Sequence, residues 1–146
     1  MTPPAVHPFD FFGRLRWLDG RPLMDTIEPY RRETFARVLY TFDPDGRPCY
    51  DRAFIGRAKK NNKTTDLMLS GLYRLLAWQS PAGNDSFILA NDEGQATDDL
   101  ILAKKLIAAN PILAGEVEVK QREIARHDGR GALTVLPAFF SKPAKL

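Results

Sequence analysis

Residues 56–65 bring basic and hydroxyl side chains together between a predicted strand and a predicted helix. The segment contains, in order, Gly56, Arg57, Ala58, Lys59, Lys60, Asn61, Asn62, Lys63, Thr64 and Thr65. In a phosphate-binding loop, a lysine at the start of a helix reaches the β and γ phosphates, and the hydroxyl that follows it binds Mg²⁺. Backbone N–H groups of the loop and of the helix N-terminus surround the anion. Lys63 and Thr64 occupy these two positions, so the segment is a candidate site for ATP with Mg²⁺.

The match to the consensus G-x-x-x-x-G-K-[ST] is incomplete. Arg57 stands at the first glycine and Asn62 at the second. Asparagine tolerates the left-handed backbone better than other non-glycine residues, so Asn62 can hold the turn at some energetic cost. On spacing alone, a solvated basic loop before an ordinary amphipathic helix explains the segment equally well.

Hydrophobic spacing predicts the elements that must position this loop. Apolar residues return at helical intervals in three segments, and turn residues separate several short apolar runs. The predicted helices run from a cap at Asp25 or Thr26 to near Phe42, from Lys63 to Trp78 and from about Ala96 to Ala109. The predicted strands lie at 50–55, 87–90, 117–119, around Ile124 and at 132–136. Alternating strands and helices predict an α/β fold.

The two ends of the chain differ from its middle. Residues 1–24 place prolines around Phe9, Phe11, Phe12 and Trp17, which predicts an aromatic arm that packs by its rings and has little regular structure beyond one turn. Residues 25–138 form the predicted domain, and residues 139–146 form a short tail of different character. Cys49 is expected to be a small buried residue without a role.

The composition and net charge of the chain exclude several classes of function. Lys and Arg number 21 against 18 Asp and Glu, a net charge of +3 that permits an anionic partner without the basic excess of proteins that coat nucleic acid. One cysteine and two histidines exclude a disulfide framework and a zinc site. Apolar runs are too short to span a membrane, so we expect a cytoplasmic protein without membrane contact.

Several motifs resemble, in order and spacing, the large subunit of tailed-phage terminases, the motors that package viral DNA. The run 60–65 is similar to the K-N-G-K-[ST] core of that family's phosphate loop, and Glu28, Pro29 and Tyr30 are similar to its adenine-side motif. Further landmarks are the turn at 43–46, the strand at 87–90, Gln95 and Ala96, the helix end at 109–111 and the late hairpin up to Ala138. The resemblance covers residues 14–138 and implies a partial P-loop NTPase-like sheet with flanking helices.

The resemblance also implies roles for individual residues. Lys63 would bind phosphate, Thr64 would bind Mg²⁺ and Tyr30 would stack on adenine, although its helical spacing fits a core residue equally well. Arg31 stands where the family usually has glutamine, which leaves base selectivity open. The remaining residues assigned to the nucleotide site are Lys59, as an additional phosphate contact, with Lys60, Asn61, Asn62 and Thr65. The implied partners are double-stranded viral DNA, the terminase small subunit and the portal, with homo-oligomerisation also open.

An ATPase of this kind needs a carboxylate at the end of a neighbouring strand to hold Mg²⁺. No Asp or Glu follows Asp128, where the family's acidic motif would be approaching. Asp92 and Glu93 are a weaker alternative, because Asp92 serves equally well as a helix cap. We therefore expect an N-terminal ATPase segment that is truncated before its acidic motif and hydrolyses ATP at a rate near background.

Two further hypotheses come from other function classes. The chain could be a non-enzymatic nucleic-acid or protein-binding module, whose candidate phosphate contacts are Lys59, Lys60, Lys63, Lys104 and Lys105. It could also be a truncated remnant with an unpaired sheet edge and exposed apolar surface.

Overall fold

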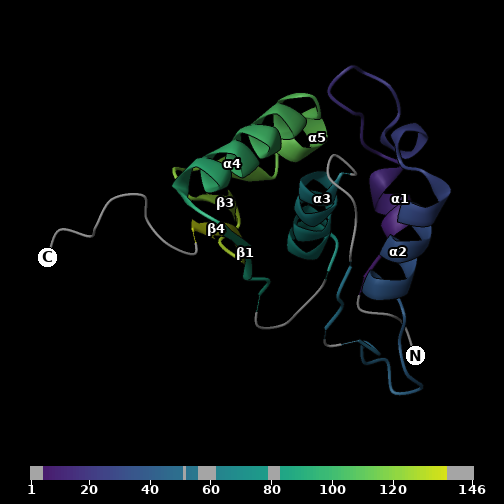
Figure 1. The fold of residues 1–146 in the computed structure, drawn as a ribbon. Coiled ribbons are helices and arrows are strands. Elements are labelled where there is room, and N and C mark those ends of the chain that lie inside the picture. Colours follow the sequence, from purple (N-terminus) through teal and green to yellow (C-terminus); the bar gives the residue numbers. More distant parts are fainter. Residues whose placement is uncertain (1–4, 51, 56–61, 79–82, 138–146) are drawn as a thin grey trace, which may run out of the picture.

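The computed structural model describes residues 5–50, 52–55, 62–78 and 83–137. Within these ranges the chain forms a mixed four-stranded sheet with the order β1-β4-β3-β2 (Figure 1). The strands are β1 (Ser86–Ala90), β2 (Val117–Val119), β3 (Glu123–Arg126) and β4 (Ala132–Pro137). β1 and β4 are parallel, with Ile88 opposite Val135, whereas β3 is antiparallel to both β2 and β4. The predicted α/β class, with its strands at 87–90, 117–119, around Ile124 and at 132–136, is confirmed.

The sheet has one buried face because apolar residues alternate along its strands. Ile88 on β1, Ile124 on β3 and Leu133 and Val135 on β4 point to the buried face. Helices α3 (Lys63–Leu76) and α4 (Glu93–Ala108) both contact β1 and β4 and cover this face. α3 approaches β4 so closely that a Cβ atom on Gly71 would lie 2.8 Å from a methyl carbon of Leu133.

The opposite face of β1 and β4 carries exposed apolar side chains. Phe87 and Leu89 are 65% and 72% exposed, and Leu136, which is in register with Leu89, is exposed as well. Among the described residues, β1 pairs only with β4, so its other edge has no strand partner within those ranges.

The N-terminal residues pack against the helical side of the domain. α1 (Pro8–Phe12) is a single short helix, followed by the 3₁₀ helix η1 (Leu23–Thr26) and by α2 (Pro29–Leu39). The Phe12 ring lies 5.0 Å from the ring of Phe35 on α2, and the Phe11 ring lies 5.9 Å from Tyr73 on α3. The aromatic rings thus pack as expected, and α3 lies between the sheet and α1 and α2 (Figure 1).

One side chain fixes the segment after α1 to the end of α4. The amide of Asn110, which is buried, accepts a hydrogen bond from the backbone N–H of Arg16 at 2.7 Å and donates to the carbonyl of Arg16 at 2.9 Å. It also donates to the carbonyl of Leu106 at 2.8 Å. Asn110 immediately precedes α5 (Pro111–Ala114), so this amide joins three segments of the chain.

Three predictions made from the sequence are wrong in detail. The helix expected from residue 25 starts only at Pro29, because Glu28 before the proline is held in extended backbone (φ −64°, ψ 155°). The strand expected at 50–55 is absent from the described residues of that segment, and Phe54 is 98% exposed. Cys49, expected to be buried, is exposed.

Candidate functional site

One residue in the left-handed backbone conformation directly precedes α3. Asn62 precedes the helix in the left-handed conformation (φ 63°, ψ 27°) and is the sole non-glycine residue with positive φ in the described ranges. Its carbonyl accepts the N–H of Asp66 at 2.9 Å, which closes the first helical turn. The expectation that Asn62 can hold a left-handed turn is thus confirmed, and its role in a phosphate loop stays a prediction.

Lys63 and the threonines that follow it begin the helix. Lys63 is exposed, and Thr64 and Thr65 are half-buried in the first turn. The N–H groups of a first turn have no carbonyl partner within the helix, and the helix dipole makes this end attractive to anions. Lys59, Lys60 and Asn61 lie outside the described residues, so their expected roles stay predictions.

A buried ion pair attaches α2 to this turn. The guanidinium of Arg31 donates to the carboxylate of Asp66 through Nε (3.0 Å to Oδ1) and Nη2 (2.7 Å to Oδ1). Nε also lies 3.3 Å from Oδ2. Arg31 is 2% exposed and Asp66 is 9% exposed. The pair therefore joins the first turn of α2 to the turn that carries Lys63 and Thr64.

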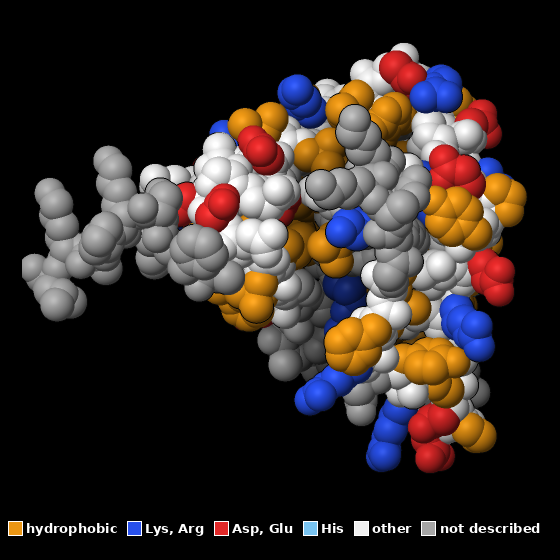
Figure 2. Space-filling model, in the orientation of Figure 1, with side chains coloured by type: hydrophobic (Ala, Val, Ile, Leu, Met, Phe, Trp, Pro, Cys, Tyr) orange, Lys and Arg blue, Asp and Glu red, His pale blue; other side chains and the backbone are white. Residues whose placement is uncertain are grey.

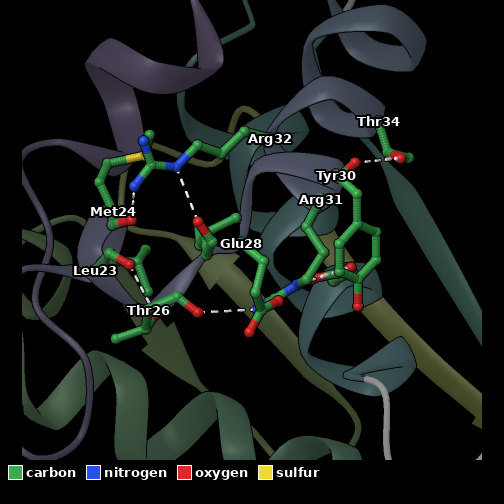
Figure 3. A network of polar contacts seen from close by, with 10 residues as sticks. Leu23, Met24, Thr26, Glu28, Tyr30, Arg31, Arg32 and Thr34 are labelled. Carbon is green, nitrogen blue, oxygen red and sulfur yellow. Dashed lines mark hydrogen bonds and ion pairs between the residues drawn. The ribbon is translucent and has the colours of Figure 1, made fainter.

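The remaining donors of Arg31 bind the start of α2. Nη1 donates to the carbonyl of Thr26 at 3.0 Å and to the carboxylate of Glu28 at 3.1 Å (Figure 3). Burial by itself lowers the pKa of Arg31, but the hydrogen bonds and charges of Asp66 and Glu28 outweigh it and raise the pKa above its ordinary value. The guanidinium therefore stays charged, and it fixes η1, α2 and α3 with respect to one another.

Tyr30 lies at the first turn of α2, next to Arg31 (Figure 3). Its side chain is 49% exposed, so the alternative that it is an ordinary core residue is wrong. The hydroxyl of Thr34 donates to the Tyr30 carbonyl at 3.0 Å, and the two residues share a helix face because they are four positions apart. Tyr30 therefore lies one turn before Thr34, on the face that continues into a pocket.

The pocket lies between α2, α3 and residues 53–55 and has a volume of about 240 Å³. Its walls are mostly apolar, and Lys63, Asp66 and Ser70 contribute the polar groups on the α3 side. The other lining residues are Thr34, Phe35, Val38, Leu39, Ala53, Ile55 and Leu67. On the face seen in Figure 2, Lys or Arg side chains and hydrophobic side chains lie next to one another along the hollow in the middle of the molecule. An apolar pocket with a few polar groups is a typical small-molecule site.

The acidic residues near α4 have structural roles in the described residues. The carboxylate of Asp92 accepts the N–H of Gln95 at 2.9 Å and caps α4, as the alternative interpretation expects. Asp99 is buried and accepts a hydrogen bond from the Gln95 amide at 2.8 Å. Burial raises the pKa of Asp99, and the Gln95 hydrogen bond opposes this only in part. The described residues contain no cluster of three or more His, Cys, Asp or Glu able to hold a metal ion.

The two lysines of the alternative nucleic-acid surface lie on another element. Lys104 and Lys105 are exposed on α4, whereas Lys63 begins α3. No helix in the described parts of the chain combines the length and the apolar character needed to cross a membrane.

The Arg31–Asp66 pair was not foreseen from the sequence, although a signal for it exists. Ile27, Arg31 and Phe35 are spaced four residues apart, and all three are buried. An arginine within an apolar helical stripe requires a buried acceptor. The sequence nevertheless does not identify which carboxylate supplies it.

The fold agrees with a solved structure. Comparison with protein families found no matching family model, and comparison with curated proteins found no match. The crystal structure of the HK97 bacteriophage large terminase matches with a TM-score of 0.76 and 21% sequence identity, over 96% of this chain. The chain spans 28% of the length of that terminase. The described residues therefore have a terminase-like fold.

Proposed function

We propose that this chain is the N-terminal ATPase segment of a phage terminase large subunit and that it binds the phosphates of ATP at the N-terminus of α3. The observation that carries the proposal is the left-handed Asn62 directly before Lys63 and Thr64 at the start of a long helix. This backbone conformation at the position of the consensus glycine is what a phosphate loop needs and a plain solvated loop does not. The terminase-like fold supports the same assignment.

The roles within this site follow from the chemistry of the side chains. The Lys63 ammonium supplies a positive charge for the β and γ phosphates, and the Thr64 hydroxyl supplies an oxygen ligand for Mg²⁺. Mg²⁺ held by Thr64 would offset the negative charge of the phosphates. These residues fit the polyphosphate well, because a cation and a helix N-terminus meet there.

Tyr30 and the adjacent pocket are suited to the base. An exposed tyrosine offers an aromatic face for stacking, and the apolar walls that begin at Thr34 continue from it toward Lys63. We propose that adenine lies on the Tyr30 side and the phosphates on the Lys63 side. Arg31 is not available to read the edge of the base, because its guanidinium is buried against Asp66 and Glu28.

Hydrolysis by this chain alone is proposed to be near background. Asp92 caps α4, and no Asp or Glu follows Asp128 in the sequence. The described residues contain no cluster of acidic side chains able to hold a metal ion, so we propose that they bind nucleotide without accelerating phosphoryl transfer. Double-stranded viral DNA, the terminase small subunit and the portal are the proposed partners of the complete motor, which places the chain in the cytoplasm of the bacterial host.

Calorimetric titration of the 146-residue chain with Mg-ATP tests the proposal. Saturable binding that Lys63→Ala weakens by about tenfold or more is expected, because this variant loses a charge-assisted contact to phosphate. Lys105→Ala is the matched control, since it removes the same charge from an exposed position on α4. A folded chain that binds no Mg-ATP, or one whose two variants bind as well as the parent, would overturn the proposal.

The exposed face of β1 and β4 favours a second candidate function, a protein-binding module or remnant. Phe87, Leu89 and Leu136 form a contiguous apolar surface beside an open strand edge. Such a surface promotes association between chains. Sedimentation velocity over a range of concentrations distinguishes the two: association that is indifferent to nucleotide supports the module, and a monomer that binds Mg-ATP supports the ATPase segment.

A further inference from the structure

We infer that Arg31 is a positioning residue that keeps the N-terminus of α3 electropositive by neutralising Asp66 while holding that turn against α2. The inference rests on the proposed phosphate site. It assigns a role to a residue that makes no contact with the nucleotide.

The position of Asp66 creates the need for such a residue. Asp66 follows Lys63 by three positions, so the two side chains are neighbours on the surface of α3, and both line the same pocket. A carboxylate in the first turn of a helix is attracted by the helix dipole. It therefore cancels part of the positive potential that would otherwise act on a phosphate at that end.

Arg31 offsets this negative charge at short range. Its Nη2 lies 2.7 Å from Oδ1 of Asp66, and its Nε lies within hydrogen-bond distance of the same carboxylate. Both residues are largely shielded from solvent, so the interaction is little screened by salt. With the pair intact, an anion at the helix N-terminus meets the charge of Lys63 and the dipole, and Asp66 is offset by Arg31. The second carboxylate on Arg31, that of Glu28, has a half-exposed side chain, so solvent screens its charge more strongly.

The geometry explains why the residue is arginine. A single guanidinium reaches Asp66 on α3, the carbonyl of Thr26 in η1 and the carboxylate of Glu28 before α2. The planar fork of arginine supplies five donors in fixed directions, whereas a lysine ammonium cannot satisfy these acceptors from one position. The same contacts set the Tyr30 turn relative to Lys63, and they thereby fix the distance between the proposed base and phosphate subsites.

The test uses ligands that separate the phosphate end from the base end. Tripolyphosphate and Mg-ATP are titrated into the parent chain, Arg31→Gln and Asp66→Asn, with thermal unfolding measured for each variant. Both substitutions break the same ion pair, so a purely structural role predicts that both weaken binding alike. The electrostatic role predicts opposite directions for tripolyphosphate.

The expected result is that Arg31→Gln weakens tripolyphosphate binding by about tenfold or more, because Asp66 loses the guanidinium that offsets its charge beside the site. Asp66→Asn is expected to bind tripolyphosphate as tightly as the parent or more tightly, despite a lower melting temperature. Arg31→Lys, which keeps the charge but not the fork, is expected to retain tripolyphosphate binding better than Arg31→Gln and supplies the comparison if the latter does not fold.

Two results overturn the inference in distinguishable ways. Equal losses of tripolyphosphate affinity in Arg31→Gln and Asp66→Asn would leave the phosphate site in place and reject the electrostatic role of Arg31. A folded parent chain that binds neither ligand would reject the proposed function, and the inference would fall with it.

Discussion

Arg31 and Asp66, which are 35 positions apart, form a buried ion pair in which Nη2 lies 2.7 Å and Nε lies 3.0 Å from the same carboxylate oxygen. The pair joins two elements that the sequence separates by a long loop. The contribution of this pair to the free energy of unfolding can be measured without a ligand.

Arg31→Ala is expected to destabilise the fold by about 3 kcal/mol, because it removes the guanidinium that is hydrogen-bonded to the buried carboxylate of Asp66. Urea denaturation at neutral pH measures the change in the free energy of unfolding. The double variant Arg31→Met with Asp66→Leu is expected to recover most of the loss, since it removes both charges and keeps apolar volume. A double variant as unstable as Arg31→Ala would contradict this explanation.

Asn62 should show the energetic signature of left-handed backbone. Asn62→Val is expected to lower the free energy of unfolding by about 1–2 kcal/mol, because a β-branched side chain clashes in this conformation. Asn62→Gly is expected to be nearly neutral, since relief of strain is offset by the greater freedom of glycine in the unfolded chain. Chemical denaturation of both variants tests this, and a Val variant as stable as the parent would exclude a left-handed residue at this position.

Gly71 and Gly94 provide a matched pair of helical glycines. Gly71→Ala places a methyl group 2.8 Å from a Leu133 methyl carbon and is expected to destabilise the fold by about 1 kcal/mol, because overpacking outweighs the gain in helix propensity. At the exposed Gly94, a Cβ would lie 3.3 Å from Asp92 Oδ1, a side-chain atom that needs to move by only a few tenths of an ångström. Gly94→Ala is therefore expected to change stability by less than Gly71→Ala, with a gain in helix propensity of at most about 1 kcal/mol. Thermal melts that rank the two variants in the reverse order would contradict the close approach of α3 to β4.

Asp99 is expected to lower the stability of the fold at pH values at which its carboxyl group is ionised. Burial raises its pKa in the folded state above the unfolded value, so its ionisation penalises folding as the pH rises through the unfolded pKa toward the folded one. Asp99→Asn is therefore expected to raise the melting temperature at pH 7, and the gain should vanish at a pH below both pKa values. Melting curves of parent and variant across this range measure the effect; a gain independent of pH would assign it to something other than ionisation.

Local patterns predicted most of the fold. Apolar spacing located α3, α4 and all four strands of the described sheet, and the tolerance of asparagine for positive φ anticipated the backbone at Asn62. The prediction of a strand at 50–55 was wrong because a strand needs a neighbouring strand to pair with, and the alternation of apolar residues does not specify one. Phe54 satisfies the pattern and yet is almost fully exposed.

Only those residues of the candidate site that are adjacent in the sequence could be predicted. The order Asn62, Lys63 and Thr64 is visible in the sequence, whereas the pairing of Arg31 with Asp66 depends on how two helices cross. The helical spacing of Tyr30 is compatible with a buried and with an exposed position. The reason is that the width of the buried stripe on α2 depends on which elements pack against that helix. Its half-exposed position depends on how α2 packs in the complete fold, which the sequence pattern does not specify.

The hydrogen bonds between Asn110 and Arg16 connect residues 94 positions apart. A ribosome makes the aromatic segment first and the amide that holds its end much later. During synthesis, the backbone groups of Arg16 therefore have water as their partner until α4 is complete and Asn110 has left the exit tunnel. A chain whose synthesis stops within α4 would therefore lack the amide that binds the backbone of Arg16, although Phe11 and Phe12 could still pack on Tyr73 and Phe35.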